Sequence, residues 1–239
     1  MRLRRVGAPQ AGRARHRLKV PLFDRLKADA AEDWRAYVGH AFVQGLGDGS
    51  LPKECFRHYL IQDYLFLIQF ARAYALAAYK APDLDTLRYA AKAMGAILDE
   101  MKLHVGLAGE WGASEADLAA ATEARATVAY TRLVLDAGMQ GDLLDLMTAL
   151  SPCVVGYAEI GTALAKAPRG LAADNPYCGW IAEYSGEAYQ AVAADARAGL
   201  DRLAATSLTE ARYPRLLQLF RQATRLEADF WQMGLDLAG

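Results

Sequence analysis

The 239-residue sequence predicts a single all-α domain. Apolar side chains recur at three- and four-residue steps along most of the chain, and this spacing places them on one face of an α-helix. No segment shows the sustained alternation of apolar and polar residues that a half-buried β-strand requires. Proline, glycine and small polar residues stand between the periodic segments, as is typical of helix ends. We expect the domain to cover residues 20–239.

The first helical segment presents one continuous apolar face. The residues on this face are Phe23, Leu26, Ala30, Trp34 and Tyr37. The glycine-rich stretch 45–49 then predicts a turn. After it, Ser50 is a potential N-cap, and Pro52 is tolerated in the first turn of the next helix. This helix should run to about Lys80, because the residue before a proline, here Pro82, disfavours helical backbone.

The rest of the chain predicts further helices with recognisable starts. Ser114 is the expected N-cap of a short helix after a tight turn. Asn175 is a potential N-cap with Pro176 at the first helical position, and that helix should end near Thr206. Residues 207–210, Ser-Leu-Thr-Glu, have the spacing of a capping box before the last helix. The other helices should cover about residues 87–108, 121–137 and 142–166.

Charge is distributed unevenly along the chain. The formal net charge is −1, but residues 1–19 hold seven of the 27 basic side chains and no acidic one, which leaves 20 basic against 28 acidic groups in the remainder. An acidic body does not support nucleic-acid binding. The basic segment lacks the apolar core of a secretory signal, and a charge run of this kind is typical of a disordered extension. We therefore expect no nucleic-acid partner and a disordered segment at 1–19.

Hydropathy and cysteine content predict a cytoplasmic protein. A hydrophobic share of 54% and a charged share of 23% are ordinary for a soluble globular domain. No uninterrupted apolar stretch is long enough to span a bilayer, so no membrane association is expected. The cysteines are odd in number and widely spaced, at Cys55, Cys153 and Cys178. This pattern fits a reducing compartment and argues against a disulfide framework or a thiolate zinc site.

Cys153 follows Pro152 inside an apolar helical stretch, with Tyr157 one turn further along the same face. Two arrangements are open. If Pro152 opens a helix with Ser151 as its N-cap, Cys153 lies in the first turn, where free amides and the helix dipole favour the thiolate. If Pro152 lies inside a longer helix, it frees a carbonyl one turn back and kinks the helix at the thiol. A buried, unreactive cysteine is the simpler alternative.

Two carboxyl groups occupy positions where the helical pattern expects apolar core. Asp63 has aromatic and aliphatic helical neighbours, so it must be paired, hydrogen bonded or kept for a ligand. Glu227 shares its face with Phe230 and Trp231. Burial against aromatic rings would raise the pKa of Glu227, which suits a proton donor near neutral pH. Without a function, Asp63 would pair with a neighbouring tyrosine and Glu227 would form a salt bridge between helices.

Three tyrosines and one histidine spacing complete the candidate residues. Tyrosine combines an apolar ring with a hydrogen-bonding tip, which suits the wall of a pocket for a flat polar ligand. The candidates are Tyr130, Tyr157 and Tyr184. Glu100 and His104 stand four residues apart, a spacing that could serve a metal, but no Glu-x-x-His pair of the di-iron type occurs. The sequence therefore predicts no metal site.

With these residues assembled, the chain resembles the TenA family, the thiaminase II or aminopyrimidine aminohydrolase proteins. The resemblance covers about residues 20–237, and its motifs occur in the family order, which makes the set far more specific than any single motif. These motifs lie at residues 40–52, 59–64, 100–104, 130–131, 151–157, 175–177, 180–184 and 226–231. The resemblance implies a haem-oxygenase-like helical bundle, a homotetramer, and no cofactor or metal.

The resemblance also implies an activity and residue roles. It implies that aminomethylpyrimidine from thiamin breakdown is hydrolysed to hydroxymethylpyrimidine and ammonia, and that thiamin could be cleaved in the same way. Cys153 matches the catalytic cysteine that attacks the pyrimidine ring, and Glu227 matches the acid that protonates a ring nitrogen. Asp63 matches the aspartate that orients the ring. The substrate-binding residues implied in this way are Asp63, Phe66, Tyr130, Tyr157 and Tyr184.

Two positions depart from the family pattern. Phe66 stands where some members carry tyrosine, so a ring is kept there but a hydroxyl is lost. The family's Pro-Cys-Tyr-Trp stretch reads Pro-Cys-Val-Val at 152–155, so that wall of the pocket is less bulky. Both differences bear on substrate preference more than on reaction type.

Three other functions stay open. A non-catalytic pyrimidine-binding or regulatory protein could use the same bundle, although the presence of both Cys153 and Glu227 argues against a pure binder. An oxidative metalloenzyme of the same fold would use Glu100 and His104. A DNA-binding regulator fits least, because the body of the chain is acidic.

Overall fold

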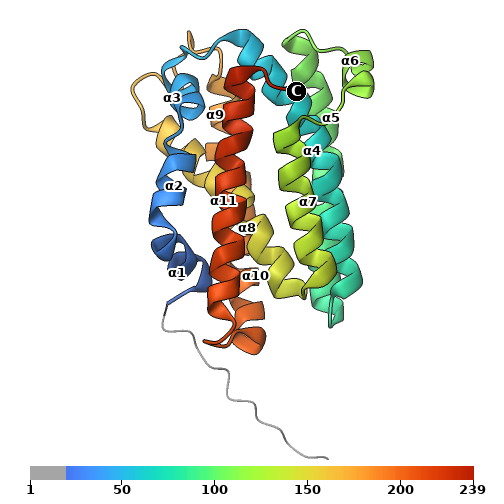
Figure 1. Cartoon of the computed structure of the whole chain (residues 1–239). Helices are drawn as coiled ribbons and strands as arrows, with labels where there is room; N and C mark the ends of the chain where they lie inside the picture. The colour runs from blue at the N-terminus through green and yellow to red at the C-terminus, as the bar shows by residue number, and fades with distance from the viewer. Residues whose placement is uncertain (1–19) are drawn as a thin grey trace, which may run out of the picture.

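The computed structural model describes residues 20–239, and helices are the only regular elements in that range (Figure 1). The long helices are α4 (Lys53–Lys80), α5 (Leu84–Glu110), α7 (Arg125–Gln140), α8 (Leu143–Ala165), α10 (Glu187–Ser207) and α11 (Tyr213–Asp236). The short ones are α1 (Leu22–Asp29), α2 (Ala31–Val38), α3 (Ala41–Asp48), α6 (Glu115–Ala120) and α9 (Cys178–Ser185). The predicted all-α fold is confirmed. The basic segment 1–19 lies outside the described residues.

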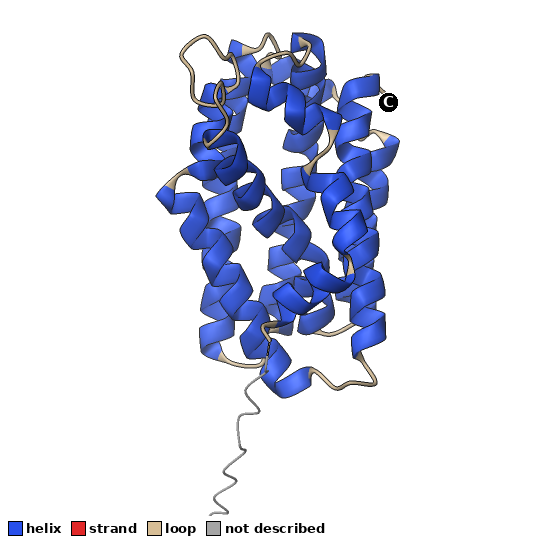
Figure 2. Cartoon of the chain, turned by 90° about the vertical axis from the view of Figure 1, so that its left-hand side faces the viewer, coloured by secondary structure: helices blue, strands red, loops and turns tan. Residues whose placement is uncertain are grey.

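Helix α8 is the central element of the bundle. It packs against α7, α9, α10 and α11, while α4 packs against α5 and α7. Figure 1 shows α11 between two groups of helices, with α1, α2 and α3 on one side and α4, α5 and α7 on the other. In the view turned by 90°, the long helices run along the length of the molecule and the loops gather at its two ends (Figure 2).

By length and composition alone, α8 could cross a membrane, although Asp145 and Glu159 interrupt its apolar run. Its apolar window, however, is 89% buried inside the protein, so this composition reflects its place at the centre of the bundle. A helix that is covered on every side needs apolar residues all round rather than on one face.

The predicted first apolar face is confirmed, because Phe23, Leu26, Ala30, Trp34 and Tyr37 are all buried. The backbone along this face is interrupted at Ala30, where α1 ends and α2 begins. The predicted end of α4 at Lys80 is confirmed. The predicted cap at Ser114 is confirmed as well, and it forms a complete capping box at the start of α6.

The glycine-rich stretch 45–49 is not the turn that its composition predicts. Gly45 and Gly47 lie inside α3, and only Gly49, with φ of 78°, turns the chain. Packing explains the helical glycine at 47, because a Cβ atom there would lie 2.7 Å from Leu164 Cδ2 of α8. The composition of this stretch therefore reflects close helix contact as well as turning.

Three predicted N-caps are wrong. The amide of Ser50 donates a hydrogen bond within the preceding turn, and α4 starts without a side-chain cap. The side-chain amide of Asn175 donates to the carbonyl of Leu46 (3.0 Å) in α3, and its side-chain oxygen accepts from the amide of Tyr177 (2.9 Å), so Asn175 ties its loop to α3, and α9 starts only at Cys178. The helix expected to follow it is divided into α9 and α10. Ser207 is the last residue of α10, and α11 also starts without a side-chain cap. In each case a loop contact or turn replaces the cap.

Pro152 lies inside α8, so the arrangement in which it opens a helix is wrong and its interior position is confirmed, while the kink expected at the thiol stays a prediction. A proline has no amide proton, and Pro152 therefore leaves the carbonyl of Thr148 without its helical partner. The hydroxyl of Ser151 donates to this carbonyl instead (2.9 Å). Ser151 thus satisfies the backbone group that the proline frees, and α8 continues through Cys153.

Candidate active site

A cavity of about 200 Å³ lies among α4, α5, α8, α9 and α10. Five of the seven predicted site residues line it, namely Asp63, Phe66, Cys153, Tyr157 and Tyr184. Exposed side chains on α5 and α10 form its outer part, among them Lys92, Val192 and Asp195. Since an apolar cavity of about 150 Å³ accepts a benzene ring, this volume suits a six-membered ring with small substituents.

The other two predicted site residues, Glu227 of α11 and Tyr130 of α7, are not in the cavity wall: Glu227 lies beside Cys153, and Tyr130 is bound to Glu227. Glu227 is only 2% exposed. Tyr130 Oη donates a hydrogen bond to Glu227 Oε1 (2.7 Å), so a phenol takes the place of the salt bridge considered as an alternative. Burial raises the pKa of Glu227 to about 8, and the neighbouring Tyr130, Cys153 and Tyr37 side chains oppose this rise. Glu227 is therefore mainly protonated at neutral pH.

Cys153 is a free thiol in the middle of α8, and it stays partly accessible because it faces the cavity. Burial raises the pKa of Cys153 well above its ordinary value, and the nearby carboxyl groups of Glu227, Asp63 and Glu100 raise it further. The thiol does not lie in the first turn of its own helix, where the thiolate would be favoured, since α8 begins at Leu143. The resting site thus contains a neutral thiol beside a neutral carboxylic acid.

Asp63 is paired with a histidine from the next helix. His104 Nε2 of α5 lies 2.5 Å from Asp63 Oδ2, and Tyr59 Oη donates to the same oxygen (3.4 Å). The suggestion of a tyrosine partner for Asp63 is therefore correct in part. Burial raises the pKa of Asp63 well above its ordinary value and lowers the pKa of His104 to about 4. These two pKa shifts favour the protonated, neutral carboxyl of Asp63 and the neutral imidazole of His104.

The four-residue spacing of Glu100 and His104 does not bring these two side chains together as ligands. His104 turns toward Asp63, whereas Glu100 lines the cavity. Within residues 20–239, no group of three or more histidine, cysteine, aspartate and glutamate side chains is arranged to hold a metal ion. Glu100 instead adds a half-buried carboxyl, of raised pKa, to the wall of the cavity.

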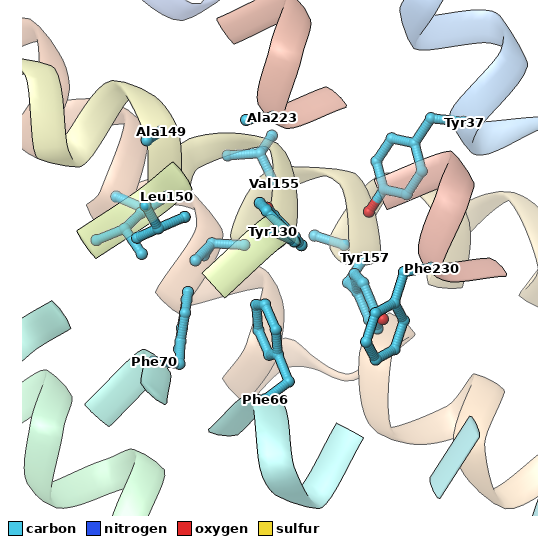
Figure 3. Close-up of a cluster of buried hydrophobic side chains, with 14 of the residues drawn as sticks. Tyr37, Phe66, Phe70, Tyr130, Ala149, Leu150, Val155, Tyr157, Ala223 and Phe230 are labelled. Carbon is cyan, nitrogen blue, oxygen red and sulfur yellow. The ribbon is translucent and has the colours of Figure 1, made fainter. Parts of the chain in front are cut away.

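Aromatic rings hold these polar groups in place. Tyr59 Oη is within hydrogen-bond distance of Tyr157 Oη (3.5 Å) and accepts from Trp180 Nε1 (3.4 Å). The rings of Tyr157 and Tyr184 meet edge to face with centroids 4.9 Å apart. Figure 3 shows Phe66 pointing toward Tyr130, and their ring centroids are 5.2 Å apart. The cavity wall and the residues behind it therefore form one continuous aromatic layer.

Tyr37 of α2 extends this layer to the buried acid. Its hydroxyl points toward α8 in Figure 3. It contributes to lowering the pKa of Glu227, although it makes no hydrogen bond of normal geometry with any described residue. Gly156 provides the space for this ring, because a Cβ atom there would lie 2.3 Å from Tyr37 Cε1. Neither residue is part of the site predicted from the sequence.

We expect the substitution Gly156→Ala to destabilise the protein by about 1–3 kcal/mol, the usual effect of overfilling a packed interior. The added methyl group would overlap the Tyr37 ring, and α8 is too enclosed to move away. Denaturant unfolding followed by far-UV circular dichroism measures the change. Gly95→Ala is the matched control in α5, because a Cβ atom there meets nothing within 4 Å. Equal stability of the two variants would contradict the packing argument.

Sequence reasoning did not include Tyr59, His104 and Tyr37 among the site residues. Tyr59 had a usable signal, because it stands one helical turn before Asp63. His104 stood out as a potential metal ligand and as part of the motif at residues 100–104, but it had no assigned role in the site. Tyr37 carried no signal beyond its place on an apolar face, since its role depends on α2 packing against α11.

The fold and the cavity together define an all-α enzyme with an internal thiol, an adjacent acid of raised pKa and space for a small ring. Sequence comparison makes this assignment specific. The chain belongs to the TENA/THI-4/PQQC family, which it matches over residues 27–237.

Individual relatives agree with this assignment. The chain is 40% identical over 205 residues to a protein of Halalkalibacterium halodurans named aminopyrimidine aminohydrolase, covering 85% of this chain and 90% of that one. It superimposes with a TM-score of 0.82 and 46% identity on a structure described as a TenA family transcription regulator from Silicibacter sp. TM1040, covering 90% and 96% of the two chains.

A domain of unknown function with a heme oxygenase-like fold, from Shewanella denitrificans, has a TM-score of 0.72 with 13% identity and coverage of 90% and 92%. At this identity the likeness concerns the fold alone. It confirms the predicted haem-oxygenase-like bundle.

Proposed function

We propose that this enzyme hydrolyses aminopyrimidines in thiamin salvage, converting aminomethylpyrimidine to hydroxymethylpyrimidine and ammonia. The observation that carries the proposal is the contact between the Cys153 thiol and the Glu227 carboxyl beside a cavity of about 200 Å³. Asp63 and three aromatic side chains (Phe66, Tyr157 and Tyr184) surround the same space. The name of the relative from Halalkalibacterium halodurans supports this substrate class.

The proposed chemistry uses the thiol as a nucleophile and the carboxylic acid as a proton donor. The sulfur of Cys153 bonds to a ring carbon while Glu227 gives its proton to the adjacent ring nitrogen, which makes that carbon electrophilic. The amine then leaves the exocyclic methylene as ammonia and takes the thiol's proton with it. Glu227 suits the donor role because it keeps its proton up to a pH of about 8.

Water completes the cycle in this scheme. Its oxygen bonds to the methylene carbon, the bond between sulfur and ring carbon breaks, and the aromatic ring is restored. The ring nitrogen returns its proton to Glu227, and the remaining proton of the water restores the Cys153 thiol. The overall reaction consumes one water and releases one ammonia, with the enzyme unchanged.

The remaining site residues would bind and orient the ring. Asp63 offers a carboxyl oxygen to an amino group, and Tyr157 and Tyr184 offer aromatic faces with hydroxyl tips. Tyr130 would act through Glu227, to which it is hydrogen bonded, rather than from the cavity wall. Phe66 keeps the ring at a position where some relatives carry a hydroxyl, and Val154 makes its part of the cavity wall less bulky.

An ammonia-release assay tests the proposal. We expect the purified protein to release ammonia and hydroxymethylpyrimidine in equal amounts from aminomethylpyrimidine, and we propose thiamin as a second substrate to be compared under the same conditions. The alternative function, a pyrimidine-binding or regulatory protein, is raised by the regulator name of the Silicibacter relative. That alternative predicts tight binding of hydroxymethylpyrimidine without ammonia release, and such a result would reject the enzymatic proposal.

Two further properties remain predictions. A homotetramer is implied by the family resemblance, and sedimentation analysis measures it directly. A cytoplasmic location is supported by the three free thiols, since an oxidising compartment favours disulfides.

A further inference from the structure

We propose that His104 is a positioning residue of the active site: it holds one oxygen of Asp63 and leaves the other oxygen to accept a hydrogen bond from the amino group of an aminopyrimidine. This inference rests on the proposed function for its ligand. Its geometry is independent of that function, because it follows from the contact between α4 and α5.

Both hydrogen bonds of the Asp63 carboxyl involve the same oxygen atom, Oδ2. His104 Nε2 lies 2.5 Å from Oδ2, and Tyr59 Oη donates to Oδ2 as well (3.4 Å). Asp63 is also part of the cavity wall, whereas His104 is not. The oxygen Oδ1 is therefore the one left for a ligand, and the direction in which it points is fixed by the two contacts to Oδ2.

His104 is also the group that can balance a charge on Asp63. The titratable groups facing Asp63 are Tyr59 on its own helix and, from other helices, Glu100, Glu227, Cys153, Tyr157 and Tyr184. All of these are acids. Among the described residues, no lysine or arginine contributes to the ionisation of Asp63. A lone carboxylate among buried acids is strongly disfavoured, so a charged Asp63 requires a basic partner.

Transfer of one proton from Asp63 to His104 over this short distance would give Asp63 its charge together with a basic partner. When the O–H bond of Asp63 breaks and an N–H bond forms at His104 Nε2, Asp63 becomes a carboxylate and His104 an imidazolium. The pair has no net charge before or after the transfer, so the cavity gains no unbalanced charge. The carboxylate form is the stronger acceptor for an amino N–H group. Ligand binding would therefore favour the ionised pair.

The variants His104→Ala and His104→Gln separate positioning from general support of the fold. Alanine removes the contact, whereas glutamine can place an amide N–H near Oδ2 but cannot accept the proton. We expect the alanine variant to raise the KM for aminomethylpyrimidine by about tenfold or more, as expected for loss of one charge-assisted hydrogen bond, with a much smaller change in kcat. At pH 8 the glutamine variant should restore the KM to within about threefold of the wild type, because its amide still positions Oδ2 and the higher pH favours the carboxylate of Asp63. His58→Ala is the matched control, because His58 also lies on a helix, its ring is hydrogen bonded to the carbonyl of Ala238, and it does not line the cavity.

The pH dependence gives a second readout that a structural role would not affect. In the glutamine variant Asp63 must ionise without an imidazolium beside it, so its KM should fall as the pH rises from 6 to 8. The wild-type KM should change little over the same interval, because the proton stays within the pair. An alanine variant with an unchanged KM would overturn the inference. So would alanine and glutamine variants that lose kcat and thermal stability equally at constant KM.

Binding of hydroxymethylpyrimidine by calorimetry keeps this test separate from catalysis. If the wild type binds this compound without releasing ammonia from aminomethylpyrimidine, the enzymatic proposal fails. The inference about His104 then still predicts about tenfold weaker binding in the alanine variant and, at pH 8, near-normal binding in the glutamine variant. Equal affinity in all three proteins would overturn the inference by itself.

Discussion

Replacing Cys153 by alanine or serine is expected to reduce ammonia release from aminomethylpyrimidine by at least about a thousandfold, because loss of a covalent nucleophile removes the reaction path itself. Folding and pyrimidine binding should be largely kept, since the side chain is small and the alanine variant opens only a little space beside the cavity. Ammonia production, melting temperature and hydroxymethylpyrimidine affinity should be measured on the same preparations.

Cys178→Ser is the matched control for this experiment. Cys178 is also a partly exposed free cysteine, at the start of α9, and it does not line the cavity. Its serine variant should keep wild-type turnover. A Cys153→Ala protein that still releases ammonia at the wild-type rate would reject the covalent mechanism, whatever the control shows.

The substitution Glu227→Gln is expected to lower kcat/KM by about a hundredfold to ten-thousandfold, the usual contribution of a general acid. Glutamine has the same shape and can still accept from Tyr130, but it has no proton to transfer at neutral pH. For the wild type, activity should fall as the pH rises through about 8, because Glu227 then loses its proton. The residual activity of the variant should not show this fall. A full pH–rate profile of both proteins measures the difference.

The same substitution should stabilise the protein at alkaline pH. In the unfolded chain Glu227 ionises near its ordinary pKa of 4.5, whereas in the folded protein its pKa is about 8. The folded state therefore binds more protons in this interval, and the free energy of unfolding falls as the pH rises from about 4.5 to about 8. Glutamine does not titrate, so the variant should gain up to about 5 kcal/mol over the wild type above pH 8 and nothing below pH 4.

Asp229→Asn is the control for both Glu227 measurements. Asp229 lies two residues further along α11 but is exposed, as its place on the opposite helical face predicts. Its amide variant should keep the activity and the pH dependence of stability of the wild type. If Glu227→Gln gains no stability between pH 5 and pH 9, the glutamate is not buried as a neutral acid.

The sequence was sufficient for most of the helices because their signal is local. Apolar spacing identifies the faces of α4 and α8, and Pro82 marks the end of α4 directly. The predicted caps at Ser50, Asn175 and Ser207 failed for a different reason. Their side chains can serve a helix or a loop equally well, and contacts from distant segments decide which. Asn175, for example, is held by the carbonyl of Leu46.

The candidate site could likewise be predicted from local sequence signals only in part. Cys153, Asp63 and Glu227 stood out because a reactive or charged group interrupted an apolar face, and the fold brings all three into one region. Their detailed states did not follow from the sequence. The pairing of Asp63 with His104 depends on how α4 lies against α5, and the raised pKa of Cys153 depends on its position in the middle of a helix rather than at its start.

The position of Cys153 inside α8 also affects how this sulfur survives between turnovers. Peroxides and alkylating agents attack the thiolate, and their rates follow the fraction of thiol that is ionised. A cysteine at a helix N-terminus would be ionised permanently and exposed to these reagents in the absence of substrate. Burial among acids raises the pKa of Cys153, so we expect this thiol to react slowly with oxidants. The nucleophilic thiolate of Cys153 would form only while a pyrimidine ring is bound, so the sulfur would be reactive only during turnover.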